Sequence, residues 1–91
     1  MNKLIHQIHN ELDMAEQYID CAARAEDDAK DVYKSIAKDE LNHAEKLIAI
    51  GNTKLASKMG DVKCKVIWEY EKDNFASKMT KLRAESSAVS N

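Results

Sequence analysis

The sequence predicts an all-α fold in which an antiparallel helical hairpin is followed by a third helix. Its 91 residues include no proline and only two glycines. Strand-rich and turn-rich folds use these two residue types at their turns. Apolar residues recur at steps of three and four, which places them on one face of an α-helix. With one tryptophan and one phenylalanine, the chain can build one domain with a small core, so we expect it to associate with other chains.

Three apolar stripes define the expected helices, at about residues 2–25, 28–50 and 61–84 of a single domain covering 1–84. The first stripe consists of Ile5, Ile8, Leu12, Ala15, Ile19 and Ala22. The second stripe consists of Val32, Ile36, Glu40, His43, Leu47 and Ile50. The third stripe consists of Cys64, Trp68, Glu71, Phe75, Met79 and Leu82. Residues 85–91 lack this periodicity, and we expect them to form a flexible tail.

The expected boundaries coincide with residues that end or begin helices. The acidic residues 26–28 would cap the second helix, where their negative charge is favourable at the positive end of the helix dipole. Because this connection is short, the first two helices are expected to be antiparallel neighbours. Gly51 and Asn52 tolerate the left-handed conformation of a helix end and predict a stop there. Residues 53–59 form either a helical turn or a continuation, and Gly60–Asp61 predicts a second break with Asp61 as the cap.

Charge and composition exclude several classes of function. A net charge of −2 argues against nucleic-acid binding, and no apolar run is long enough for a membrane span or a signal peptide. Cys21 and Cys64 form no CxxC pair, so we interpret them as buried reduced thiols. We therefore expect a cytoplasmic protein with neither a membrane nor a nucleic acid as partner.

The second stripe contains two ionisable residues, Glu40 and His43, at its centre. Their spacing of three places both side chains on one helix face, and burying an unpaired carboxylate there costs several kcal/mol. A metal ion would compensate for that cost. Glu11, on the first helix, lies at a similar distance from the hairpin turn and can face them. Two carboxylates and one imidazole suit iron or manganese, and zinc less exclusively.

These residues belong to a pattern that resembles the ferritin-like superfamily, most closely its rubrerythrin-type hairpins and the small ferritin-like proteins of phages and prophages. The pattern is Glu11-x-x-x-Ala15-x-x-Tyr18 followed by Ile36-Ala37-x-Asp39-Glu40-x-x-His43-Ala44-x-x-Leu47. The resemblance covers residues 8–48. It implies half of a di-iron site, in which Glu11 is the first-helix ligand, Glu40 the bridging carboxylate and His43 the terminal nitrogen ligand.

The chain departs from that superfamily because it carries one Glu-x-x-His motif where a complete site needs two. The resemblance therefore implies a ferritin-like half-bundle completed by dimerisation, with two copies related by a two-fold axis. Its expected activity is the binding of Fe(II), with oxidation by O₂ or peroxide. The alternative is a small helical structural or interaction protein, phage-derived, without a functional metal site.

The polar and aromatic stripe residues also have structural interpretations. Glu40 and His43 can form a hydrogen-bonded buried pair bridged to a lysine, and Glu11 can be an edge carboxylate that reaches solvent. Glu71 is either a further ligand or the partner of a lysine. His6 and His9 are expected to face solvent or an oligomer contact. The aromatic residues are expected to pack, with a radical or supporting role as the alternative at Tyr18; they are Tyr18, Tyr33, Trp68 and Phe75.

Overall fold

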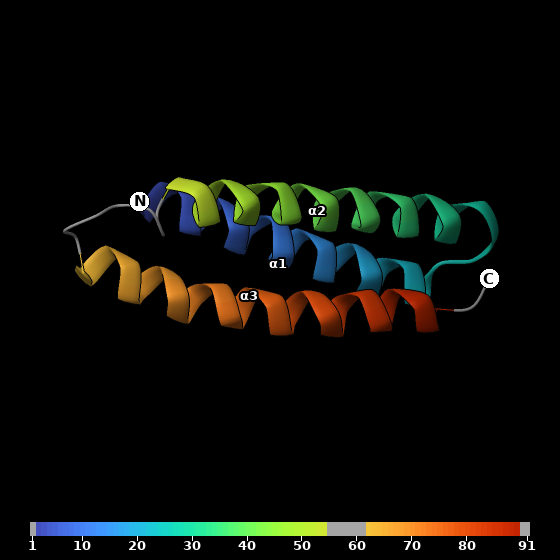
Figure 1. Cartoon of the computed structure of the whole chain (residues 1–91). Helices are drawn as coiled ribbons and strands as arrows, with labels where there is room; N and C mark the ends of the chain where they lie inside the picture. The colour runs from blue at the N-terminus through green and yellow to red at the C-terminus, as the bar shows by residue number, and fades with distance from the viewer. Residues whose placement is uncertain (1, 55–61, 90–91) are drawn as a thin grey trace.

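A computed structural model describes residues 2–54 and 62–89, which form three long helices (Figure 1). Helix α1 covers Asn2–Arg24, α2 covers Asp27–Lys54 and α3 covers Val62–Ala88. No strand occurs in this part of the chain, which confirms the all-α prediction. None of these helices is long and apolar enough to cross a membrane. The expected break at Gly60–Asp61 lies outside the described residues.

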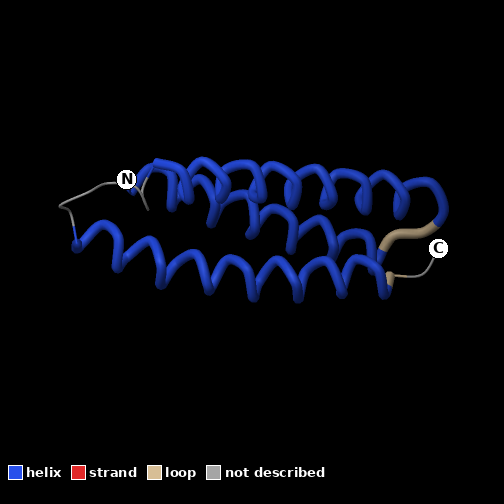
Figure 2. The backbone as a smooth tube through the Cα atoms, in the orientation of Figure 1, coloured by secondary structure: helices blue, strands red, loops and turns tan. Residues whose placement is uncertain are grey.

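Helices α1 and α2 form the antiparallel hairpin that the sequence predicts, joined by the short connection at residues 25–26 (Figure 2). The Ala25 backbone N–H donates to the carbonyl of Cys21 at 3.0 Å and closes the last turn of α1. Asp27 then starts α2 with φ at 54°, in the left-handed region, which aspartate tolerates better than most residues. The acidic connection is therefore where the chain reverses. Helix α3 lies along the hairpin, in a molecule of 53 × 17 × 15 Å.

The core is a single apolar seam along the inner sides of the three helices. The first and third stripes are confirmed in their central parts, because most of their members are buried. The packed cluster consists of Ile8, Leu12, Ala15, Ile19, Ala37, Leu41, Ala44, Trp68, Phe75, Met79 and Leu82. The contribution of α2 is small in volume, because two of its three members are alanines. This allows α1 to pack closely along α2.

The stripe predicted for α2 is wrong as a core stripe. Its members lie along one edge of the helix, where Val32 is 55% exposed, Ile50 is 43% exposed and Glu40 is half-buried. The buried face instead carries Ala37, Leu41, Ala44 and Gly51. The prediction followed the larger apolar residues of α2, whereas the close approach of α1 requires small residues on the buried face of α2.

Gly51 does not end α2, contrary to the prediction, because the helix continues to Lys54. Gly51 is buried, and a Cβ atom added there would overlap the six-membered ring of Trp68 from α3. The Trp68 indole N–H donates to Asn52 Oδ1 at 3.0 Å, which fixes the ring over this position. The glycine therefore makes room for a neighbouring helix and has no role in stopping its own.

Helix α3 also extends beyond its predicted end at residue 84 and reaches Ala88. The Lys34 ammonium on α2 donates to the Val89 carbonyl at 2.9 Å, and Val89 packs against the core. Part of the expected tail is thus helical and is held by α2. The cysteines are also less buried than expected, since Cys21 is exposed and Cys64 is half-buried.

Candidate metal centre

The hairpin brings Glu11, Glu40 and His43 together on one side of the molecule. One potential ligand atom from each of the three side chains lies within 4.8 Å of the others. The distance between His43 Nδ1 and Glu11 Oε2 is 3.6 Å, which is an ion-pair distance and too long for a hydrogen bond. The tight turn at residues 25–26 sets residue 11 opposite residues 40–43, as their separations from the turn predict. We call these three residues the Glu-Glu-His cluster.

The cluster faces away from α3. Asp13 of α1 pairs with Lys78 of α3 at 3.0 Å, and Glu45 of α2 pairs with Arg83 of α3 at 2.8 Å. Residues two positions apart on an α-helix point in nearly opposite directions, and Asp13 and Glu45 are each two positions from a cluster member. The third helix therefore covers one side of the hairpin and leaves the cluster on the other.

The electrostatics of the cluster are set by two carboxyl groups that lie close together. Among the described residues, none donates a hydrogen bond to the buried Glu11 Oε2. A hydrogen bond with the Glu11 carboxyl raises the pKa of Glu40 from 4.5 to about 7, with burial and then the charges of Glu11 and Asp39 adding to the effect and His43 opposing it. A proton on Glu40 reduces the repulsion between the two carboxyl groups, and a cation placed between them would do the same.

A hollow of about 360 Å³ opens beside the cluster and is lined by Gln7, Asn10, Glu11, His43, Lys46 and Leu47. The His43 side chain is 55% exposed, so water and small molecules reach the cluster from this side. Three protein donors with access to water leave coordination positions open, as reactive metal sites require. Gln7 and Lys46 were not among the predicted site residues, although their helical spacing from Glu11 and His43 places them beside the cluster.

Glu71 and His9 lie outside the cluster and pair with each other. His9 Nε2 is 3.0 Å from Glu71 Oε2, and the His9 ring packs edge-on against Phe75 at 4.8 Å. Glu71 of α3 thus pairs with an imidazole from α1, whereas its predicted partner was a metal ion or a lysine. His6 is exposed and is not part of this pair.

Tyr18 and Tyr33 stack on each other at the turn end of the hairpin, with ring centroids 6.1 Å apart and an interplanar angle of 27°. Both are half-buried, on the side of the hairpin that carries the cluster. They pack between α1 and α2, as expected of stripe aromatics. Phe75 and Trp68 are buried, which agrees with their interpretation as the residues that anchor α3.

The donor set fits a first-row metal ion with oxygen and nitrogen preference. Two carboxylates and one imidazole are the ligand types of non-haem iron and manganese sites, and in the described part of the chain Glu11 Oε2 lies near His43 without a hydrogen bond. Comparison with protein-family models, with curated proteins and with solved structures finds no match to this chain.

The raised pKa of Glu40 predicts an unusual dependence of stability on pH for the metal-free protein. Between pH 4.5 and 7 the folded state holds a proton that the unfolded state has released, so the free energy of unfolding falls as pH rises through this range. We expect a loss of about 1 kcal/mol, since the open side of the site screens the interaction. Urea unfolding at several pH values measures it. Glu40→Gln, which mimics the protonated form, should lack this loss, and an identical pH profile in the variant would contradict the raised pKa of Glu40.

Proposed function

We propose that this protein binds iron at the Glu-Glu-His cluster, in a site that a second copy of the chain completes. The observation that supports it is the convergence of three ligand groups from two helices, one of which offers a buried carboxylate oxygen, Glu11 Oε2, without a hydrogen bond from any described residue. Buried carboxylate oxygens are normally hydrogen-bonded, so this one calls for a compensating group. A cation placed among the three donors would satisfy it.

Iron is the metal that this donor set and the resemblance together favour, with manganese or zinc as the other ions of suitable chemistry. Bound iron would supply electron transfer to O₂ or peroxide. The carboxylates of Glu11 and Glu40 would stabilise Fe(III), and because the pKa of Glu40 is raised to about 7, loss of its proton would accompany binding. The His43 imidazole, on the open side of the cluster, would fix the position of the ion relative to the two carboxylates.

The side of the hairpin that carries the cluster also carries the apolar residues that α3 does not cover. Val32 and Ile50 are exposed on it, and Ile36 and Leu47 are half-buried between them. These four residues flank the cluster, and we call them the flanking apolar residues. A two-fold-related copy packed on this face would bury them and bring a second Glu-Glu-His cluster to the first. Six protein donors would then suffice for two metal ions, with positions left for water or an oxidant.

Aerobic titration with Fe(II) tests the proposal. We expect a ferric charge-transfer absorption that saturates at about one iron per chain. Glu40→Ala and His43→Ala should each weaken iron binding by roughly tenfold or more, because each removes one of three protein ligands. Glu26→Ala and His6→Ala are matched controls, since both residues are exposed and outside the cluster. The proposal fails if Glu40→Ala and His43→Ala bind iron as tightly as the parent does.

A second candidate function is that of a small helical structural or interaction protein. What favours it is the raised pKa of Glu40, because a protonated Glu40 hydrogen-bonded to Glu11 would stabilise the cluster without any metal. The two functions differ in their response to chelation. An iron site predicts that removing the metal from the purified protein lowers its melting temperature, whereas a structural protein melts at the same temperature with and without chelator.

A further inference from the structure

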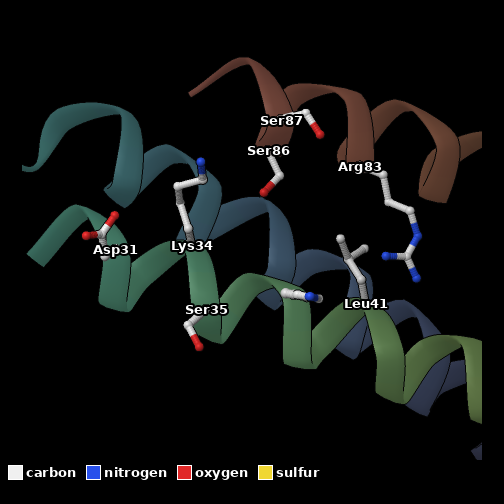
Figure 3. A pocket seen from close by; sticks show the side chains of 8 residues that line it. Asp31, Lys34, Ser35, Leu41, Arg83, Ser86 and Ser87 are labelled. Carbon is white, nitrogen blue, oxygen red and sulfur yellow. The ribbon is translucent and has the colours of Figure 1, made fainter. Parts of the chain in front are cut away.

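A second polar feature lies on the opposite side of α2, in a hollow of about 550 Å³ between α2 and α3 (Figure 3). Helices α2 and α3 pack against each other less than either packs against α1. The hollow is lined by Asp31, Lys34, Ser35, Lys38, Leu41, Arg83, Ser86 and Ser87. It is separate from the Glu-Glu-His cluster, because Lys38 and Glu40 are two positions apart on α2 and point in nearly opposite directions.

The cationic side chains of this hollow retain unused hydrogen-bond donors. Lys34 donates one hydrogen to the Val89 carbonyl and keeps two. Lys38 forms no ion pair or hydrogen bond with any residue that the structure describes. Within residues 2–54 and 62–89, Arg83 contacts Asn42 and Glu45 through Nη2 alone, at 3.5 and 2.8 Å, and its Nε and Nη1 form no hydrogen bond there. Two helices thus present unpaired donors to one space.

The charge of the lining is positive in a chain whose net charge is negative. Among the lining residues the cations Lys34, Lys38 and Arg83 outnumber the one carboxylate, Asp31, whereas the whole chain carries −2. Arg83 also pairs with Glu45 beside the hollow, so the excess positive charge lies mainly on the two lysines. The hydroxyls of Ser86 and Ser87 add neutral donors on the α3 side. In Figure 3 the side chains of Lys34, Ser86 and Arg83 extend towards the space between the two helices. An anion placed there would gain charged and neutral hydrogen bonds together.

We propose that this hollow binds the phosphate group of a small molecule, either as the free ion or as a phosphomonoester. Arginine and lysine side chains supply the charge-assisted hydrogen bonds that phosphate forms, and donors on two facing helices suit a tetrahedral group better than a planar carboxylate. The volume of 550 Å³ is that of a small-molecule site, so an organic group attached to the phosphate has room over Leu41. The proposal is independent of the iron site.

Titration of the ¹⁵N-labelled full chain with inorganic phosphate, at constant ionic strength, tests this site by NMR. We expect saturable shifts of amide signals near Lys34, Lys38 and Arg83. A parallel titration with a simple phosphomonoester, glycerol 3-phosphate, distinguishes the two sources of the group. Tighter binding of the ester assigns the ligand as a phosphomonoester, and equal binding assigns the free ion. Either result supports the site, and shifts that fail to saturate with both probes overturn it.

Lys38→Gln is the decisive variant, because Lys38 has no partner within the described chain and its loss leaves the native contacts intact. We expect this substitution to weaken phosphate binding by roughly tenfold, as loss of a charge-assisted hydrogen bond does. Lys65→Gln removes the same charge from an exposed position near the other end of α3 and should bind phosphate as the parent does. Ser86→Asp adds a negative charge to the hollow and should abolish saturable binding. Equal weakening by Lys38→Gln and Lys65→Gln would indicate general charge attraction and overturn the proposal.

Discussion

Replacing Gly51 by alanine is expected to lower the free energy of unfolding by about 2–3 kcal/mol, the typical cost of overpacking a core. Helix propensity alone predicts the opposite sign, since alanine in a helix interior is about 1 kcal/mol more favourable than glycine. The clash decides the sign because the added methyl group would overlap the Trp68 ring. The ring itself has little freedom to move, being buried and hydrogen-bonded to Asn52.

Urea unfolding at fixed protein concentration measures the effect of Gly51→Ala, and a second background isolates its cause. In a Trp68→Leu protein the same substitution should cost much less, because the ring that it meets is gone. Ala49→Gly, at an exposed position of α2, calibrates helix propensity in this helix and should cost about 1 kcal/mol. If Gly51→Ala were as stable as the parent, Trp68 could not lie over Gly51 as described.

Introducing a charge among the flanking apolar residues is expected to convert the proposed dimer to monomers. Val32→Glu and Ile50→Glu change side chains that are 55% and 43% exposed in a single chain, so neither should destabilise the fold of that chain. In the proposed dimer both positions are buried, and an unpaired carboxylate there costs several kcal/mol, or roughly a thousandfold in the dissociation constant. The amount of iron bound should fall with the dimer.

Sedimentation equilibrium at micromolar concentrations, with and without Fe(II), measures this change in mass. Val66→Glu is the matched control, because Val66 is 61% exposed but lies on α3, away from the face that carries the cluster. We expect the control to remain dimeric and to load iron normally. A parent protein that sediments as a monomer in the presence of Fe(II) would contradict the two-copy site directly.

The features that the sequence predicts well depend on local periodicity. The stripes of the first and third helices give the central core, and the acidic connection gives the hairpin. Once the hairpin exists, the separations of Glu11, Glu40 and His43 from the turn bring them to the same height, so their proximity could be predicted. Each of these inferences follows from distances along the chain and from the face that a residue occupies on its own helix.

The features that the sequence does not predict depend on how the helices are rotated and how closely they approach. On α2, a stripe of large apolar residues and a stripe of small residues are both candidates for the buried face. The position of Trp68 favours the stripe of small residues, because its ring needs the space at Gly51. The pairing of Glu71 with His9, and that of Lys34 with the Val89 carbonyl, join residues far apart in the sequence. Neither pair has a signal in the local sequence, because each forms only when α3 packs against the hairpin.

Because Trp68 packs against Gly51, its fluorescence can report on one event, the separation of α3 from the hairpin. The chain has one tryptophan, and its indole is buried at the contact between α2 and α3 with its N–H bound to Asn52. Its emission should therefore change when α3 separates from the hairpin. If the Glu-Glu-His cluster loads iron as proposed, ferric absorption would report on that loading, while the tryptophan reports on detachment of the third helix.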